Sequence, residues 1–223
     1  TTTIGYGTIQ VSSDGNLGSG GNVILQNNGT LEASNSFTLD AARVLQLAGN
    51  GSVSTDATKT LTFQGAISGS GTLTKAGTGT LLLSGNTNDS SGFSGNVAVS
   101  AGKLEVAKTT ANAVGTGSVS VTSGAALQVD NGVTLGNALS LAGTGISNSG
   151  ALVGNGSGPA TVNGAITLAD DTTIKANAGN SLVLGNTIDG GYALLLDGAG
   201  NITLGGAVGG GTALASYTSN LHT

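Results

Sequence analysis

Residues 61–85 read LTFQGAISGSGTLTKAGTGTLLLSG, and residues 182–206 read LVLGNTIDGGYALLLDGAGNITLGG. The two stretches align without a gap, and every position at which they are identical holds Leu, Ile or Gly. Leucine and isoleucine are core residues, whereas glycine permits tight turns. Identity restricted to core and turn positions indicates a chain built from recurring modules of short strands.

Short strands are also predicted outside these two stretches. A second pair of similar stretches begins at Val23 and Val119. Runs in which apolar and polar residues alternate are separated by Gly, Asn, Ser and Asp, which is typical of strands joined by turns. The predicted strands are residues 8–11, 22–25, 30–33, 37–39, 44–47, 59–63, 72–74, 81–83, 97–99, 104–106, 119–121, 127–129, 182–184, 194–196 and 202–204.

This pattern predicts an all-β fold, a parallel β-helix or β-solenoid. Three strands of about seven residues make a coil of about 20–24 residues, so the chain predicts about ten coils. At ~4.8 Å per coil, the rod is expected to be ~45–50 Å long. Helix signals are weak, because residues 40–43 and 108–114 suffice for single turns only.

Composition excludes several classes of protein. The chain has no Cys, one His, 8% charged residues and a net charge of −5. We therefore expect no disulfide scaffold, no thiolate metal site and no nucleic-acid partner. Hydrophobic residues make up 38% of the chain, which argues against a flexible linker despite 41 glycines. No apolar stretch has the ~18 residues that a membrane-spanning helix requires.

The domain organisation is predicted to be simple. Residues 1–223 are expected to form a single β-helix segment, because no linker interrupts the pattern. The sequence starts Thr1-Thr2-Thr3 and shows no initiator Met or signal peptide. It is therefore interpreted as part of a longer secreted protein.

Residues 69–86 resemble the autotransporter-associated β-strand repeat, found in passenger domains of bacterial autotransporters. They read GSGTLTKAGTGTLLLSGN, and the aromatic residue that follows in the usual repeat corresponds to Phe93 here, after extra residues. The resemblance covers most of residues 20–206. It implies a right-handed β-helix displayed outside the cell, at the bacterial surface, where such repeats mostly serve as stalk or scaffold.

Candidate metal and catalytic residues are few. Asp170 and Asp171 form an acidic pair that a Ca²⁺ site would require, but a solvated turn is the favoured interpretation. Asp14 is interpreted as a turn residue in the same way. Asp40 and Arg43 are expected to form an exposed pair. Stacking of coils would have to bring Asp40, Asp56 and Lys59 together for glycan hydrolysis.

The remaining candidates are also given structural interpretations. His222 is read as a frayed terminal residue. Tyr6, Tyr192 and Tyr217 would cover the ends of the core or contact neighbouring subunits. The pairs Thr60/Thr62, Thr72/Thr74 and Thr78/Thr80 are read as outward strand residues, with no position that recurs in each coil. The glycosylation sequons at Asn28, Asn88, Asn155 and Asn201 are attributed to composition.

The sequence therefore predicts a non-enzymatic structural stalk of a bacterial surface protein or adhesin, with no catalytic, cofactor or metal site. One alternative is a filament subunit that self-associates through its exposed solenoid ends. A second is a glycan-binding or glycan-degrading protein with a cell-surface or glycan ligand. For that alternative, the expected binding regions are residues 86–95, which contain Phe93, and residues 108–117.

Overall fold

The computed structural model describes residues 1–86 and 89–222. Thr87 and Asn88, which belong to the predicted binding region 86–95 and to one sequon, lie outside the described residues. The chain divides into two compact units, residues 1–117 and 118–223. About half of the chain is strand, and the described residues contain no α-helix but two short 3-10 helices, η1 and η2.

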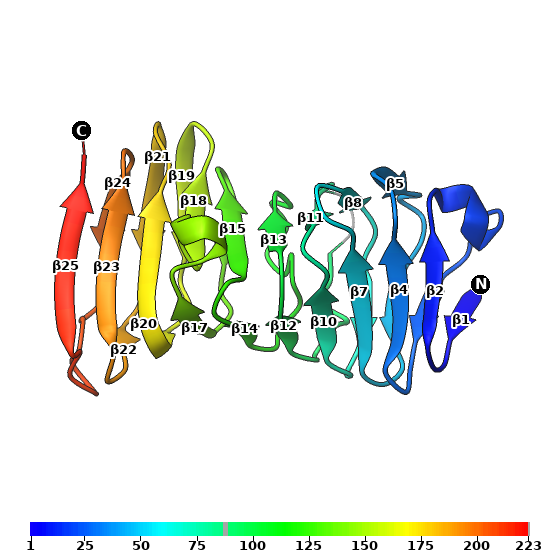
Figure 1. Ribbon diagram of the computed structural model, residues 1–223, viewed down its shortest axis with the longest axis horizontal. Helices are drawn as coiled ribbons and strands as arrows, with labels where there is room; N and C mark the ends of the chain where they lie inside the picture. Colours follow the sequence, from blue (N-terminus) through cyan, green and yellow to red (C-terminus); the bar gives the residue numbers. More distant parts are fainter. Residues whose placement is uncertain (87–88, 223) are drawn as a thin grey trace. The chain divides into compact units, whose positions relative to one another are not determined.

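The first unit consists of three parallel sheets that take one strand each from successive coils (Figure 1). One sheet is β1-β3-β6-β9, the second β2-β4-β7-β10-β12 and the third β5-β8-β11-β13. The elements are β1 (Thr2–Ile4), β2 (Thr8–Val11), η1 (Asp14–Leu17), β3 (Val23–Leu25), β4 (Gly29–Ala33), β5 (Phe37–Leu39), β6 (Leu45–Leu47), β7 (Gly51–Thr55), β8 (Thr60–Phe63), β9 (Ile67–Gly69), β10 (Leu73–Ala76), β11 (Thr80–Leu83), β12 (Val97–Val99) and β13 (Lys103–Val106).

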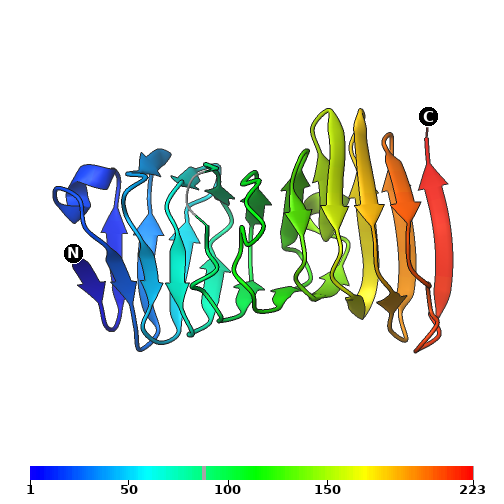
Figure 2. The ribbon, with the colours of Figure 1, turned by 180° about the vertical axis from the view of Figure 1, so that it is seen from behind.

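The second unit repeats this arrangement with longer strands (Figure 2). Its sheets are β14-β17-β20-β22, β15-β18-β20-β23-β25 and β16-β19-β21-β24, and β20 contributes to two of them. The elements are β14 (Val119–Val121), β15 (Ala126–Asp130), β16 (Thr134–Leu135), β17 (Leu139–Gly143), η2 (Ile146–Asn148), β18 (Leu152–Asn155), β19 (Gly158–Val162), β20 (Ile166–Ala176), β21 (Asn180–Leu184), β22 (Ile188–Asp189), β23 (Ala193–Gly198), β24 (Asn201–Leu204) and β25 (Ser216–Leu221).

Aliphatic side chains stack in rows inside each unit because strands pair in register with the coil above and below. In the first unit Leu61, Leu81 and Leu104 are cross-strand partners, and all three are buried. In the second unit the corresponding row is Leu127, Leu152, Ile174 and Leu196. Alternate residues point inward on a strand, so the period-two pattern read from the sequence places these residues in the core.

Close stacking of coils requires glycine at some corners. Gly77 has a φ of +69°, and a Cβ there would lie 2.4 Å from the carbonyl oxygen of Thr55 in the preceding coil. A larger residue would be strained and would push the two coils apart. The glycines shared by the two aligned stretches are therefore explained partly by backbone packing.

The predicted β-solenoid of about ten turns is confirmed. The paired stretches 61–85 and 182–206 each contain parts of four consecutive strands, β8–β11 and β21–β24. Several strands lay outside the predicted list, including β7, β9 and β25, because Gly, Ser and Thr weaken their alternation. The predicted single segment over residues 1–223 and its rod length stay predictions.

The two stretches with weak helix signals form turns and no helix, as expected. Residues 41–42 and 111–114 are turns, and Arg43 N–H donates to the carbonyl oxygen of Asp40 at 3.0 Å. The two 3-10 helices lie elsewhere, at Asp14–Leu17 and Ile146–Asn148.

Outward hydroxyl residues recur over four successive coils, since Thr8, Thr30, Ser52 and Thr74 pair across β2, β4, β7 and β10, but the row ends at Ala98 on β12. The alignment of these hydroxyl residues depends on the register between paired strands, which the sequence does not specify.

Candidate functional site

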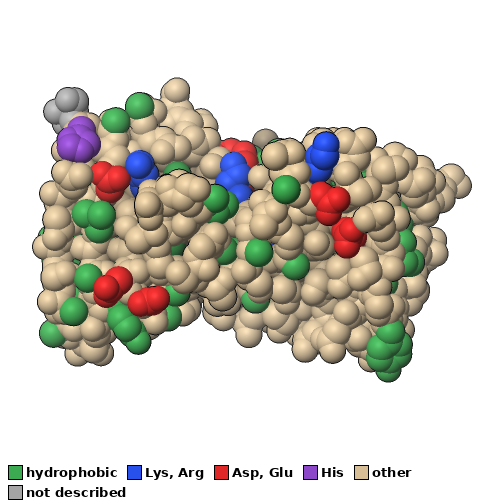
Figure 3. Space-filling model, viewed as in Figure 1, with side chains coloured by type: hydrophobic (Ala, Val, Ile, Leu, Met, Phe, Trp, Pro, Cys, Tyr) green, Lys and Arg blue, Asp and Glu red, His purple; other side chains and the backbone are tan. Residues whose placement is uncertain are grey.

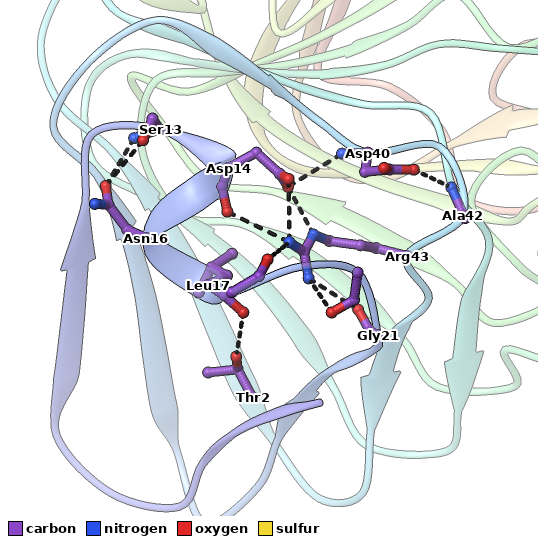
Figure 4. A network of polar contacts seen from close by, with 11 residues as sticks. Thr2, Ser13, Asp14, Asn16, Leu17, Gly21, Asp40, Ala42 and Arg43 are labelled. Atoms are coloured by element: carbon purple, nitrogen blue, oxygen red, sulfur yellow. Dashed lines mark hydrogen bonds and ion pairs between the residues drawn. The ribbon is translucent and has the colours of Figure 1, made fainter.

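Arg43 lies in the interior of the first unit and holds η1 in place (Figure 4). Its Nε donates to Asp14 Oδ1 at 2.6 Å, and Nη2 donates to Asp14 Oδ2 at 3.0 Å. Further donors reach the carbonyl oxygens of Gly18, Gly20 and Gly21 at 2.6–3.0 Å. The guanidinium thus donates hydrogen bonds both to backbone carbonyl oxygens of the loop after η1 and to a carboxylate.

This clasp corrects two expectations. Arg43 was expected to form an exposed pair with Asp40, but its side chain is fully buried and its carboxylate partner is Asp14. Asp40 instead donates its backbone N–H to Asp14 Oδ1. The hydrogen bond from Arg43 holds the pKa of Asp14 below its usual value and raises the pKa of Arg43. Asp14 is therefore more than a turn residue.

A second buried cation occupies the core row of the second sheet. Lys75 pairs with Val53 on one side and Val99 on the other, so its side chain takes an inward position. Its Nζ donates to the carbonyl oxygens of Ala76, Gly77 and Ala101 at 2.6, 2.8 and 3.2 Å. Burial lowers the pKa of Lys75 to about 8.

Lys108 is the third buried cation. Its Nζ donates to the carbonyl oxygen of Gly65 at 2.7 Å, 43 positions earlier in the chain. Burial lowers the pKa of Lys108, and the charge of Asp89 acts in the opposite direction. Residues 108–117, one of the two regions expected to bind a ligand, therefore contribute a core contact.

The second unit uses neutral amides in comparable corners. Asn155 Nδ2 donates to Asp130 Oδ1 at 3.0 Å, and Asn177 Nδ2 donates to Asn155 Oδ1 at 2.9 Å. Asn180 Nδ2 donates to the carbonyl oxygens of Asn155 and Gly158. These side chains form an amide ladder that links adjacent coils, defined here as Asp130, Asn155, Asn177 and Asn180.

The surface of the second unit is hollowed beside the β17–β18 connection, which contains η2. This groove has a volume of ≈ 370 Å³ and is lined by residues of that connection, β20, β23 and β25, among them Thr144, Asp171, Thr173, Leu195 and Thr218. We take this groove as a candidate binding site of the second unit. The sequence pattern did not indicate this groove, because Leu195 and Thr173 meet only through strand pairing.

The residues first considered for binding or catalysis do not assemble into a site. Phe93 is fully buried, so it offers no ligand contact. Asp170 and Asp171 are solvent-exposed as expected but lie within β20 instead of a turn. Among residues 1–86 and 89–222, no ion pair joins Asp40 or Asp56 to Lys59.

Metal-ligating groups, membrane-spanning helices and surface charge were the remaining features on which a site could rest. Within the described residues, no group of three or more His, Asp or Glu side chains is placed to hold a metal ion. None of the described residues lies in a helix long and apolar enough to cross a membrane. Figure 3 shows that one face carries few and scattered charged side chains.

Neither the three tyrosines nor the single histidine lines the groove, although Tyr217 lies between the lining residues Ser216 and Thr218. Tyr6 is 81% exposed, Tyr192 41% and Tyr217 49%. Tyr217 pairs with the buried Leu194 and so takes an inward position on β25, where it covers part of the core. His222 follows β25 and is exposed, and its backbone N–H donates to Gly198.

Comparison with known proteins finds one informative similarity. No family model matches the chain, and no solved structure matches it. The chain is 39% identical over 123 residues to the adhesin BmaC autotransporter of Brucella suis biovar 1 (strain 1330). The match covers 54% of this chain and 4% of that protein, so the chain spans a small part of the relative's length.

The similarity confirms the resemblance to autotransporter passenger domains that residues 69–86 indicated. The parallel β-solenoid is consistent with such a passenger domain. In sequence the chain is therefore similar to part of an autotransporter adhesin, and in fold it is a parallel β-solenoid.

Proposed function

We propose that residues 1–223 form a non-enzymatic stalk segment of an adhesin-like protein at the bacterial surface. The observation that carries this proposal is the pairing pattern: every strand of the described chain pairs in parallel with a strand of a neighbouring coil. Such a segment adds length coil by coil, ~4.8 Å each, and this lengthening requires no catalytic centre.

The interior supports a mechanical role. Backbone hydrogen bonds join successive coils, and rows of buried Leu, Val and Ile stack beneath them. Within the described residues, the scattered carboxylates form no group placed to hold a metal ion. The adhesin name of the relative agrees with a surface location.

Electron microscopy of the purified chain over a concentration series tests the stalk proposal. Rods ~45–50 Å long at every concentration are the expected result, because each coil adds ~4.8 Å. Globular particles would overturn the proposal, since a stalk has to be extended.

A second candidate function is self-assembly into filaments. The strands β1, β2, β24 and β25 each pair with one neighbour only and carry no Lys, Arg, Asp, Glu or Pro. Natural edge strands usually carry such residues to prevent association. Edge strands without such residues favour pairing with a further strand, which a second copy supplies in this second candidate function.

Fibres that lengthen with concentration in the same microscopy experiment would favour this second candidate. The variant Asn220→Lys places a charge on β25 and is expected to shorten them. Asn186→Lys, outside the edge strands, serves as the matched control. Fibres that persist in Asn220→Lys would show that β25 is not the contact.

A further inference from the structure

We propose that the groove beside η2 binds a neutral sugar, a pyranoside unit of a host or bacterial glycan. This inference goes beyond the stalk role, because it assigns a ligand to one place on the solenoid. The groove volume of ≈ 370 Å³ lies within the ~300–1,000 Å³ range of small-molecule sites. It belongs entirely to the second unit.

The floor of the groove is an outward row of the sheet. Thr173 on β20, Leu195 on β23 and Thr218 on β25 are successive cross-strand partners, and all three line the groove. Leu195 is half-buried and supplies an aliphatic surface between two hydroxyl residues. Sugar rings present C–H faces flanked by hydroxyl groups, so this floor matches them in chemistry.

The Thr173 hydroxyl is left without a hydrogen-bond partner among the described residues. Its side chain is only 4% exposed, yet it lines the groove. Among the described residues, three side-chain atoms have no hydrogen-bond partner and no contact with solvent: Thr55 Oγ1, Thr110 Oγ1 and Asn180 Oδ1. Thr173 Oγ1 is not one of these three atoms. Solvent therefore reaches the Thr173 hydroxyl from the groove, where a ligand hydroxyl can replace it.

The neighbouring residue Thr172 differs from Thr173, because its hydroxyl has hydrogen-bond acceptors within the protein. The Thr172 hydroxyl lies 3.1 Å from the carbonyl oxygen of Leu141 and 2.8 Å from that of Asp170. It donates its hydrogen to one of these two acceptors. It is fully engaged by the protein. Thr173 consequently carries the nearly buried polar group that remains for a ligand.

Asp171 provides an acceptor at the same groove. Its Oδ1 accepts the backbone N–H of Ala193 at 2.9 Å, which fixes the carboxylate against β23. The side chain is exposed, so its other oxygen is accessible to a hydroxyl donor. Carboxylate acceptors form strong charge-assisted hydrogen bonds with O–H groups.

Charge decides between neutral and anionic sugars. No residue that lines the groove is Lys, Arg or His. Lys175, two positions from Thr173, is paired with Asp197 at 3.2 Å. Asp171 would repel a sialylated or sulfated ligand, so the groove favours uncharged pyranosides.

Saturation-transfer NMR with the complete chain tests the assignment, using lactose, cellobiose, chitobiose and mannobiose as neutral probes. At least one is expected to receive saturation at millimolar concentration, and 6′-sialyllactose is expected to receive less. Thr173→Val keeps the size of the side chain and removes the hydroxyl, so affinity should fall about threefold to tenfold.

Thr74→Val is the matched control, because Thr74 is an outward strand hydroxyl in the first unit. It should leave the transfer unchanged. Leu195→Lys should abolish binding by filling the groove, while circular dichroism confirms that the variant remains folded. The proposal is overturned if no neutral probe receives saturation, if sialyllactose or a lysine-containing peptide binds more strongly, or if Thr74→Val and Thr173→Val have equal effects.

Discussion

The buried polar side chains differ in kind between the two units. Residues 1–117 bury the cations Arg43, Lys75 and Lys108, whereas the buried polar residues described between 118 and 222 are neutral. Those neutral residues are Gln128, Asn137, Thr172, Thr173 and Asn180. Both units face the same problem, because carbonyl oxygens at the corners of a coil need donors.

The two solutions have different physical consequences. A long cationic side chain reaches several carbonyl oxygens from within the core, but its charge is costly to bury and depends on pH. An amide is shorter, carries no charge and bridges adjacent coils at a half-buried corner. We therefore expect the stability of the first unit, more than that of the second, to respond to pH.

The largest effect is expected from Arg43→Ala, which removes the cation of the clasp. Asp14 and the carbonyl oxygens of Gly18, Gly20 and Gly21 would lose their donor. We expect a loss of about 3 kcal/mol in the free energy of unfolding of the first unit. Urea denaturation with hydrogen exchange at residues 14–21 measures it.

The control for this variant is Asp40→Asn, which keeps the acceptor that Ala42 uses. It should change stability by less than about 0.5 kcal/mol. An Arg43→Ala variant as stable as this control would show that the clasp contributes nothing to stability.

The pH dependence of Lys75 gives the next effect. The folded pKa is about 8 and the ordinary value is 10.5, so between these values the unfolded chain binds more protons. Stability should therefore rise with pH across this window, by up to about 3 kcal/mol relative to Lys75→Met. Urea denaturation from pH 7 to pH 11 measures the difference.

Lys103→Met is the control here, since Lys103 is a partly exposed residue paired with Glu105. This variant keeps Lys75, so the rise in stability between pH 8 and pH 10.5 should persist in it. Parallel profiles for Lys75→Met and wild type would contradict a buried, perturbed ammonium.

A smaller effect is expected in the second unit from Asn155→Ala. The substitution removes the central member of the amide ladder and leaves Asp130 and Asn177 without that partner. The expected loss is about 2 kcal/mol, with no dependence on pH between 8 and 10.5. Asn186→Ala, at an exposed corner, is the matched control for denaturation, and equal losses would argue against the ladder.

The smallest effect is expected outside both interiors. Thr74→Val replaces an outward hydroxyl of the row formed by Thr8, Thr30, Ser52 and Thr74. We expect a change of less than about 0.5 kcal/mol in thermal or urea unfolding. A larger loss would mean that this row stabilises the sheet as the interior rows do.

The inward position of Lys75 could have been predicted from the sequence. Leu73 is inward and side chains alternate along a strand, so Lys75 shares its face. The contact between Lys108 and Gly65 could not, because the two residues are 43 positions apart and no repeat links them. The partner of Arg43 was also misassigned, since Asp40 is close in sequence but Asp14 is close in space.

The sequence by itself determined many of the strands, their inward faces and the stacked parallel architecture. These follow from local alternation, turn residues and the repeated Leu, Ile and Gly positions, which act over a few residues at a time. The tertiary structure alone decided which residues meet across coils: the clasp, the buried lysines, the amide ladder and the groove. Such contacts depend on register and corner geometry, which a one-residue slip would change completely.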